Sequence, residues 1–194
     1  MFTFSIDKMT WINPPEEYKV SEDMVEMTTM PNSDLWQRTY YGFRRTNAHM
    51  LVMPTDEQYF SFYLKTEYDG KILYDQCGMV IYQDEDNWFK CALEYADEEY
   101  QDLGSVVTNN GYSDWGTTPV SASIKTIYFR LSRRKSDFRL EHSFSGEDYK
   151  QMRVFHLVSG GGEIRFGIYA CSPSDTTCNA LFTDMRITEC VWEI

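Results

Sequence analysis

Apolar and polar residues alternate along much of the 194-residue chain, with the period of two that a half-buried strand requires. The clearest runs are residues 59–65, 88–95 and 126–133. Clusters of Gly, Pro, Asn and Asp separate these runs from one another, and no segment shows the 3.6-residue period of a convincing amphipathic helix. The pattern predicts ten to fourteen short strands in an all-β, antiparallel β-sandwich of jelly-roll type.

Two segments are harder to assign. Leu35 and Trp36 begin either a short helical turn capped by Ser33 or Asp34 or a loop at the edge of the sandwich, and we favour a loop that leads into a strand over residues 39–43. After the predicted strand at residues 105–108, we expect a loop at residues 114–116, because Asp114 and Gly116 are turn-forming residue types.

The length and composition indicate one folded domain over residues 1–194. Hydrophobic residues make up 42% of the chain and aromatic residues 16%, which is far from the composition of disordered segments. A single β-sandwich of this length can bury a large aromatic core. We find no internal repeat and no linker.

The charge disfavours two classes of partner. The formal net charge is −12, so binding to nucleic acid or to an anionic membrane is not expected. The densest basic patch, at residues 133–135, falls in a predicted hairpin turn, and we interpret it as a solvated corner. The chain shows neither a secretory signal pattern nor an apolar run long enough to span a bilayer, so we expect a cytoplasmic protein.

Cysteine and histidine spacing predicts no cofactor and no metal site. The five cysteines are scattered without a Cys-x-x-Cys pair, which favours free thiols in a reducing compartment. The three histidines lie far apart and show no zinc-binding spacing. No calcium-binding loop is evident.

The run at residues 88–95 contains the best candidate for a functional site. Alternation places one set of side chains toward the core (Phe89, Cys91, Leu93 and Tyr95) and the other set on the outer face (Trp88, Lys90, Ala92 and Glu94). Aromatic and charged side chains gathered on one curved sheet are the types that recognise sugars. The residues predicted to form this concave face are Tyr82, Trp88, Lys90, Glu94, Arg130 and Glu141. The competing interpretation is a solvated face with ordinary cross-strand ion pairs.

The sequence does not establish catalysis. A glycoside hydrolase requires two carboxyl groups about 5 to 10 Å apart. Glu94 and Glu98 lie on one predicted face but about 13 Å apart if the chain is extended, which is too far. A pair from adjacent strands, such as Glu94 with Glu141, stays open. No Gly-x-Ser-x-Gly motif for a nucleophilic serine is present.

Four collinear motifs carry a family resemblance. They begin at Asn32 (NSDLWQRTYYGF), Cys77 (CGMVIYQDEDNWFK), Leu103 (LGSVVTNNGYSDW) and Ala170 (ACSP). The chain resembles the proteins of unknown function related to fungal regulation of enolase protein 1, which have a concanavalin A-like lectin/glucanase sandwich. The chain departs from the family at Ser145, Gly146 and Tyr149, where an Asp-Gly turn and a tryptophan are usual.

The resemblance implies a link to carbohydrate metabolism but no defined reaction, since a fold does not dictate an activity. Three hypotheses follow. The first is a non-catalytic protein that binds a carbohydrate ligand on the concave face. The second is a glycan-active enzyme that uses Glu94 with a carboxylate of a neighbouring strand. The third, which follows only from the resemblance, is a regulatory protein whose partner is a glycolytic enzyme.

Overall fold

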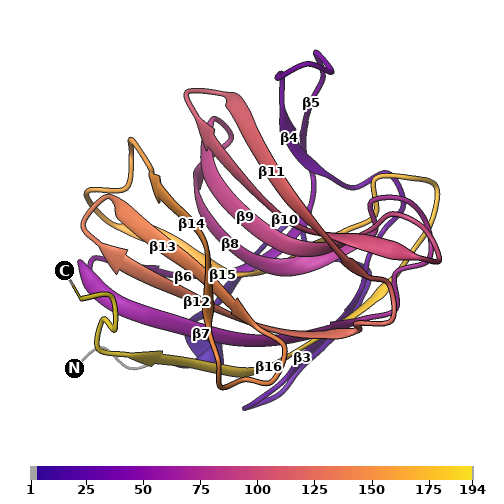
Figure 1. Cartoon of the computed structure of the whole chain (residues 1–194). Coiled ribbons are helices and arrows are strands. Elements are labelled where there is room, and N and C mark those ends of the chain that lie inside the picture. The colour runs from indigo at the N-terminus through magenta and orange to yellow at the C-terminus, as the bar shows by residue number, and fades with distance from the viewer. Residues whose placement is uncertain (1–3, 194) are drawn as a thin grey trace.

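Strands make up nearly all the regular structure of the chain. The computed structural model describes residues 4–193 (Figure 1), in which a short 3-10 helix, η1 (Ile6–Lys8), precedes 16 strands. One seven-stranded sheet, sheet A, has the order β1 (Thr10–Ile12), β6 (His49–Thr55), β15 (Ile164–Cys171), β8 (Gln76–Asp84), β9 (Asn87–Tyr95), β10 (Tyr100–Asn109) and β11 (Tyr112–Ser121).

The second seven-stranded sheet, sheet B, packs against sheet A. Its order is β14 (Lys150–His156), β13 (Asp137–Ser143), β12 (Thr126–Arg134), β7 (Tyr59–Tyr68), β16 (Asn179–Thr188), β3 (Val25–Thr28) and β2 (Glu17–Val20). A separate hairpin, β4 (Leu35–Gln37) and β5 (Arg44–Thr46), stands on the outer side of sheet A (Figure 1). The predicted antiparallel β-sandwich is confirmed.

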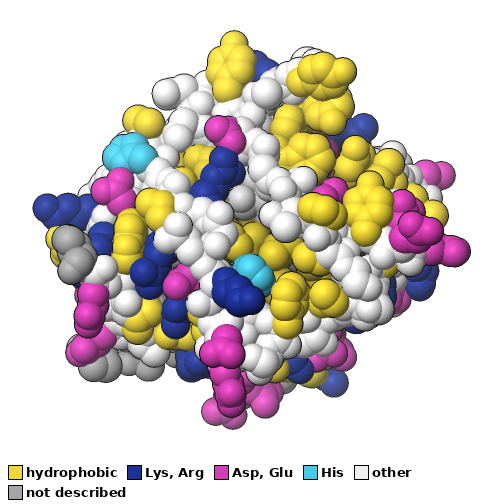
Figure 2. Space-filling model, viewed as in Figure 1, with side chains coloured by type: hydrophobic (Ala, Val, Ile, Leu, Met, Phe, Trp, Pro, Cys, Tyr) yellow, Lys and Arg dark blue, Asp and Glu magenta, His cyan; other side chains and the backbone are white. Residues whose placement is uncertain are grey.

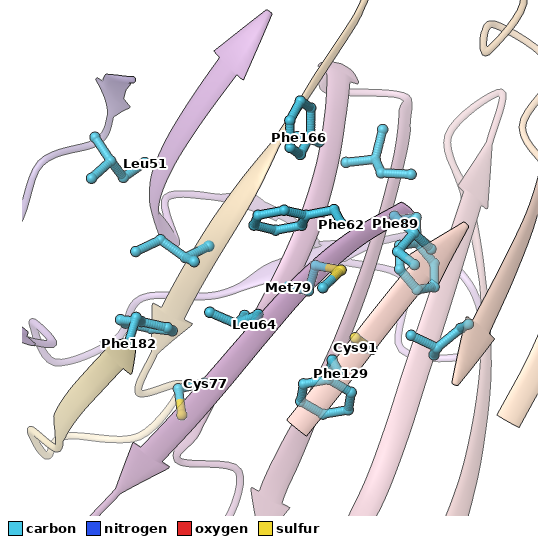
Figure 3. Packing of buried hydrophobic residues seen from close by; sticks show 14 of the residues in the cluster. Leu51, Phe62, Leu64, Cys77, Met79, Phe89, Cys91, Phe129, Phe166 and Phe182 are labelled. Atoms are coloured by element: carbon cyan, nitrogen blue, oxygen red, sulfur yellow. The ribbon is translucent and has the colours of Figure 1, made fainter. Parts of the chain in front are cut away.

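An aromatic core holds the two sheets together. Phe62 from β7 in sheet B meets Phe166 from β15 in sheet A, with ring centroids 4.9 Å apart (Figure 3). Phe89 from β9 stacks on Phe155 from β14 at 4.2 Å. These side chains come from the apolar positions of the alternating runs, so the period of two read from the sequence places the core correctly.

A second apolar cluster lies on the outer side of sheet A. Its members include Val80, Trp88 and Val106 from the sheet, and the hairpin contributes Leu35 and Trp36. Because β4 and β5 cover this side, the central strands of sheet A are buried on both faces, and β9 is buried at every position except its two ends. The competing interpretation, a solvated outer face, is therefore wrong for these central strands.

Three local predictions are also corrected. Residues 39–43 connect β4 to β5 and do not form a strand, and residues 114–116 belong to the edge strand β11. Arg133 is fully buried, not part of a solvated corner, because its guanidinium donates hydrogen bonds to four backbone carbonyls. Two of these carbonyls belong to Gly160 and Gly162, so Arg133 holds the glycine-rich turn in place.

The stacked pair of Phe89 and Phe155 generates the first prediction. Replacing Phe89 with alanine removes a fully buried ring and leaves a cavity, so we expect the free energy of unfolding to fall by about 3–5 kcal/mol. Urea denaturation of the purified variant measures this loss.

The matched control is Val154→Ala, because Val154 lies in the neighbouring edge strand β14 and is 50% exposed. We expect this variant to lose at most about 1 kcal/mol. Equal losses in the two variants would contradict a core that depends on aromatic packing between the sheets.

Candidate ligand-binding site

A hollow of about 250 Å³ opens on the outer side of sheet A, between the sheet and the β4–β5 hairpin. Strands β8, β9 and β10 supply its floor, and loops and the hairpin supply its walls. Lys90 and Glu94 on β9 point into this hollow because they occupy the alternating positions that face away from the core. We call this cavity the first hollow.

The Lys90 ammonium is only 3% exposed and is held by a polar group on each side. Its Nζ donates a hydrogen bond to Gln76 Oε1 at 2.8 Å and lies 3.7 Å from Asp34 Oδ1. The Tyr169 hydroxyl also donates to Gln76 Oε1, at 3.0 Å, and the ammonium lies 5.6 Å from the centre of the Tyr169 ring. A buried charge of this kind is tolerated only with such partners.

Glu94 is 4% exposed and lies across from Gln76 on β8 and Asp102 on β10. Burial raises the pKa of the Glu94 carboxyl to about 7. The Asp102 and Asp34 carboxylates push this pKa further up, whereas the Lys90 ammonium and a hydrogen bond from the Trp115 indole N–H oppose the rise. Near neutral pH, Glu94 can therefore either donate or accept a hydrogen bond.

Gly104 on β10 leaves the space that the Glu94 carboxylate occupies. A Cβ atom at this position would lie 2.6 Å from Glu94 Oε1 and 3.3 Å from the Trp115 indole nitrogen. The absence of a side chain at Gly104 is thus a requirement for the geometry of the floor.

The walls of the first hollow are mainly aromatic. Trp36 and Trp115 meet edge to face at 6.3 Å, and Tyr74 meets Trp115 at the same distance. Tyr41 packs on Trp36 at 5.5 Å and lies beside Phe43. The arrangement combines apolar ring surface with a small number of buried polar groups, as small-molecule sites commonly do.

Of the six residues predicted to form a site, the structure brings only Lys90 and Glu94 into the first hollow. Tyr82 and Trp88 lie on the same side of sheet A, but they are buried in the outer apolar cluster. Arg130 and Glu141 lie on β12 and β13 in sheet B, where they form a two-hydrogen-bond ion pair at 2.7 and 2.8 Å. The prediction that all six residues share one face is therefore wrong. The pairing of Glu94 with Glu141 is also wrong, because Glu94 lies in sheet A and Glu141 in sheet B.

The sequence pattern does not predict several residues of the hollow. Asp34, Trp36 and Tyr41 come from a segment whose hairpin the pattern does not indicate, and Trp115 lies in β11, where the pattern predicts a loop. The signal available was composition: the segment at residues 35–43 contains four aromatic residues, which is unusual for a solvated loop.

Metal binding has no support in the described part of the chain. Within residues 4–193, no three His, Cys, Asp or Glu side chains are grouped to hold a metal ion. The five cysteines are free. No helix over the same residues is long and apolar enough to cross a membrane.

The fold and the hollow define a two-sheet antiparallel β-sandwich with an aromatic-walled cavity on the outer face of one sheet. The chain belongs to a family of proteins of unknown function, DUF1349, whose model matches residues 11–190. This confirms the resemblance seen in the four sequence motifs.

A relative in Saccharomyces cerevisiae is named Regulation of enolase protein 1. It is 27% identical over 179 residues, which cover 92% of this chain and 88% of the relative. A crystal structure of a functionally unknown protein from Saccharomyces cerevisiae superposes with a TM-score of 0.90 at 25% identity, covering 97% of this chain and all of that one.

Glycoside hydrolase structures share the fold over part of their length. The GH43 protein BlXynB from Bacillus licheniformis has a TM-score of 0.65 at 16% identity, over 87% of this chain and 33% of that chain. A xylan β-1,4-xylosidase from Bacillus halodurans has a TM-score of 0.66 at 14% identity, over 86% and 33%. At this identity the likeness shows the fold alone.

The raised pKa of Glu94 predicts a pH-dependent stability. The folded protein holds the Glu94 proton up to about pH 7, whereas the unfolded chain releases it near the ordinary value of 4.5. Between these values the folded state binds more protons, so the free energy of unfolding falls as pH rises, by about 3 kcal/mol in total. Glu94→Gln removes this contribution.

We therefore expect the stability of wild type relative to Glu94→Gln to decrease by up to about 3 kcal/mol from pH 5 to pH 8, as measured by urea denaturation. The comparison cancels the titration of all other groups that the two proteins share. A difference between the two proteins that stays constant with pH would show that Glu94 titrates normally.

Proposed function

We propose that the protein binds a neutral, hydroxyl-rich small molecule, of the class of a sugar unit, in the first hollow. The observation that carries the proposal is the pairing of a buried polar floor with aromatic walls. Lys90 and Glu94 are almost completely buried, yet both line a cavity. Burying such polar groups costs free energy. Because both groups line a cavity that a ligand can enter, we interpret them as ligand-binding groups.

The floor matches the hydrogen-bonding pattern of a sugar. The Asp34 carboxylate accepts hydrogen bonds from hydroxyl groups, Glu94 can accept or donate one, and the Lys90 ammonium donates to hydroxyl oxygens. Aromatic side chains such as Trp36 and Trp115 cover the apolar faces of a sugar ring. Because the Asp34 carboxylate already lies 3.7 Å from the Lys90 ammonium, the floor does not favour an anionic ligand.

The names of one relative and of the fold neighbours are compatible with a carbohydrate ligand, but they do not identify it. One is named for the regulation of enolase, and the fold neighbours include enzymes that act on xylan. We propose a non-catalytic, cytoplasmic role in carbohydrate metabolism, in which ligand binding at the first hollow is the primary event.

A second candidate is a glycan-active enzyme, and one feature favours it. Glu94 has a pKa of about 7, which suits a general acid, and Asp102 lies directly across from it on β10. If the protein is an enzyme of this kind, wild type releases product from an oligosaccharide and Glu94→Gln does not. In the binding proposal neither protein releases product.

Isothermal titration calorimetry with D-glucose, D-galactose, D-mannose, D-xylose and L-arabinose tests the proposal. We expect wild type to bind at least one of these sugars. Gly104→Ala should bind the same sugar with an affinity at least about tenfold lower, because the added Cβ displaces the Glu94 carboxylate.

The matched control is Gly116→Ala on β11, where an added Cβ meets nothing within 4 Å. This variant should bind as wild type does. Lack of heat with every sugar would contradict the proposal and favour a protein partner, for which a glycolytic enzyme such as enolase is the first candidate to test by pull-down.

A further inference from the structure

A second hollow lies beside the first and shares a wall with it. Its volume is about 430 Å³, and Trp36, Tyr41 and Trp115 line both cavities. The two cavities are therefore neighbours on one face of the molecule. Figure 2 shows hydrophobic side chains gathered over the top of this view, where β4, β5 and the turn between β10 and β11 lie in Figure 1.

The shared wall is built from rings that meet nearly at right angles. The planes of Trp36 and Trp115 differ by 83°, and those of Trp36 and Tyr41 by 72°. In an edge-to-face pair, only one face of the receiving ring is covered, so ring surface remains for a ligand. This shared wall can therefore stack against ligand rings in both cavities.

The second hollow is the more exposed of the two. Tyr40 lines it and is 94% exposed, whereas Lys90 and Glu94 at the floor of the first hollow are at most 4% exposed. Asp114 also lines the second hollow and keeps most of its carboxylate in solvent while paired with Arg153. A ligand can thus enter deeply in the first hollow and extend outward over the second.

The backbone holds Tyr40 in this exposed position at a conformational cost. Tyr40 has a φ of 59°, in the left-handed region that a bulky residue rarely adopts. The hairpin is fixed at both ends of its turn: Arg38 donates a hydrogen bond of 2.7 Å to the Gly111 carbonyl, and Arg44 donates one of 3.0 Å to Asp86. An exposed ring on an anchored turn is pre-organised for contact with a ligand.

We infer that the ligand is a chain of at least two sugar units. The terminal unit occupies the first hollow, and the next unit crosses the shared aromatic wall and stacks against Tyr40 in the second hollow. This inference rests on the proposed function, and it adds the class of ligand, an oligosaccharide end, and a second subsite with Tyr40 as its main contact.

Calorimetry with matched mono- and disaccharides tests the inference: D-glucose against cellobiose and maltose, and D-xylose against xylobiose. We expect wild type to bind at least one disaccharide about three- to tenfold more tightly than its monosaccharide, as one added aromatic contact provides. Tyr40→Ala should remove this gain and leave the affinity for the monosaccharide unchanged.

The control variant is Tyr100→Ala, because Tyr100 is 42% exposed at the start of β10 and lines neither hollow. It should keep the full gain. Equal affinities for mono- and disaccharides, or a gain that survives Tyr40→Ala, would overturn the second subsite while leaving the proposed function intact. Lack of binding by every sugar would overturn both.

Discussion

The buried ammonium of Lys90 is the constraint on which the outer face of sheet A depends. A charge with 3% exposure must have polar partners close by, and Gln76 and Asp34 supply them from two different segments. Tyr169 adds a hydrogen bond to Gln76 and a ring near the ammonium. Asp34 is held in place by the hairpin segment, so the hairpin and the sheet are tied together through one charged group. The aromatic residues of the hairpin then have a fixed position over the floor.

This arrangement explains why the central strands of sheet A are buried on both faces although the protein is a two-layer sandwich. The inner layer is an aromatic core between the sheets, and the outer layer is the apolar cluster beneath β4 and β5. Lys90 and Glu94 are concentrated at a cavity, and their burial shifts the Glu94 pKa to about 7.

Alternation along the sequence was sufficient to find the sandwich, the core set at Phe89, Cys91 and Leu93, and the outward set at Lys90 and Glu94. It could not show that Arg130 and Glu141 belong to the other sheet, because strand order depends on pairings between residues far apart in the chain.

The structure departs from the local sequence pattern in two places. The β4–β5 turn has positive φ at Arg38 and Tyr40, which are not residue types typical of turns, so the sequence does not indicate this hairpin. Strand β11 contains Asp114 and Gly116, which are turn-forming residue types that an edge strand tolerates, so the sequence predicts a loop where Trp115 lies in a strand.

The most direct test of the central claim, that the aromatic-walled hollow binds a sugar, is a titration of the ¹⁵N-labelled protein with xylobiose and cellobiose, followed through the tryptophan indole N–H signals by NMR. Binding at the first hollow predicts shifts for Trp36 and Trp115 and none for Trp192, which lies beside Arg139 of sheet B. Unchanged signals for Trp36 and Trp115 at saturating sugar would contradict the account.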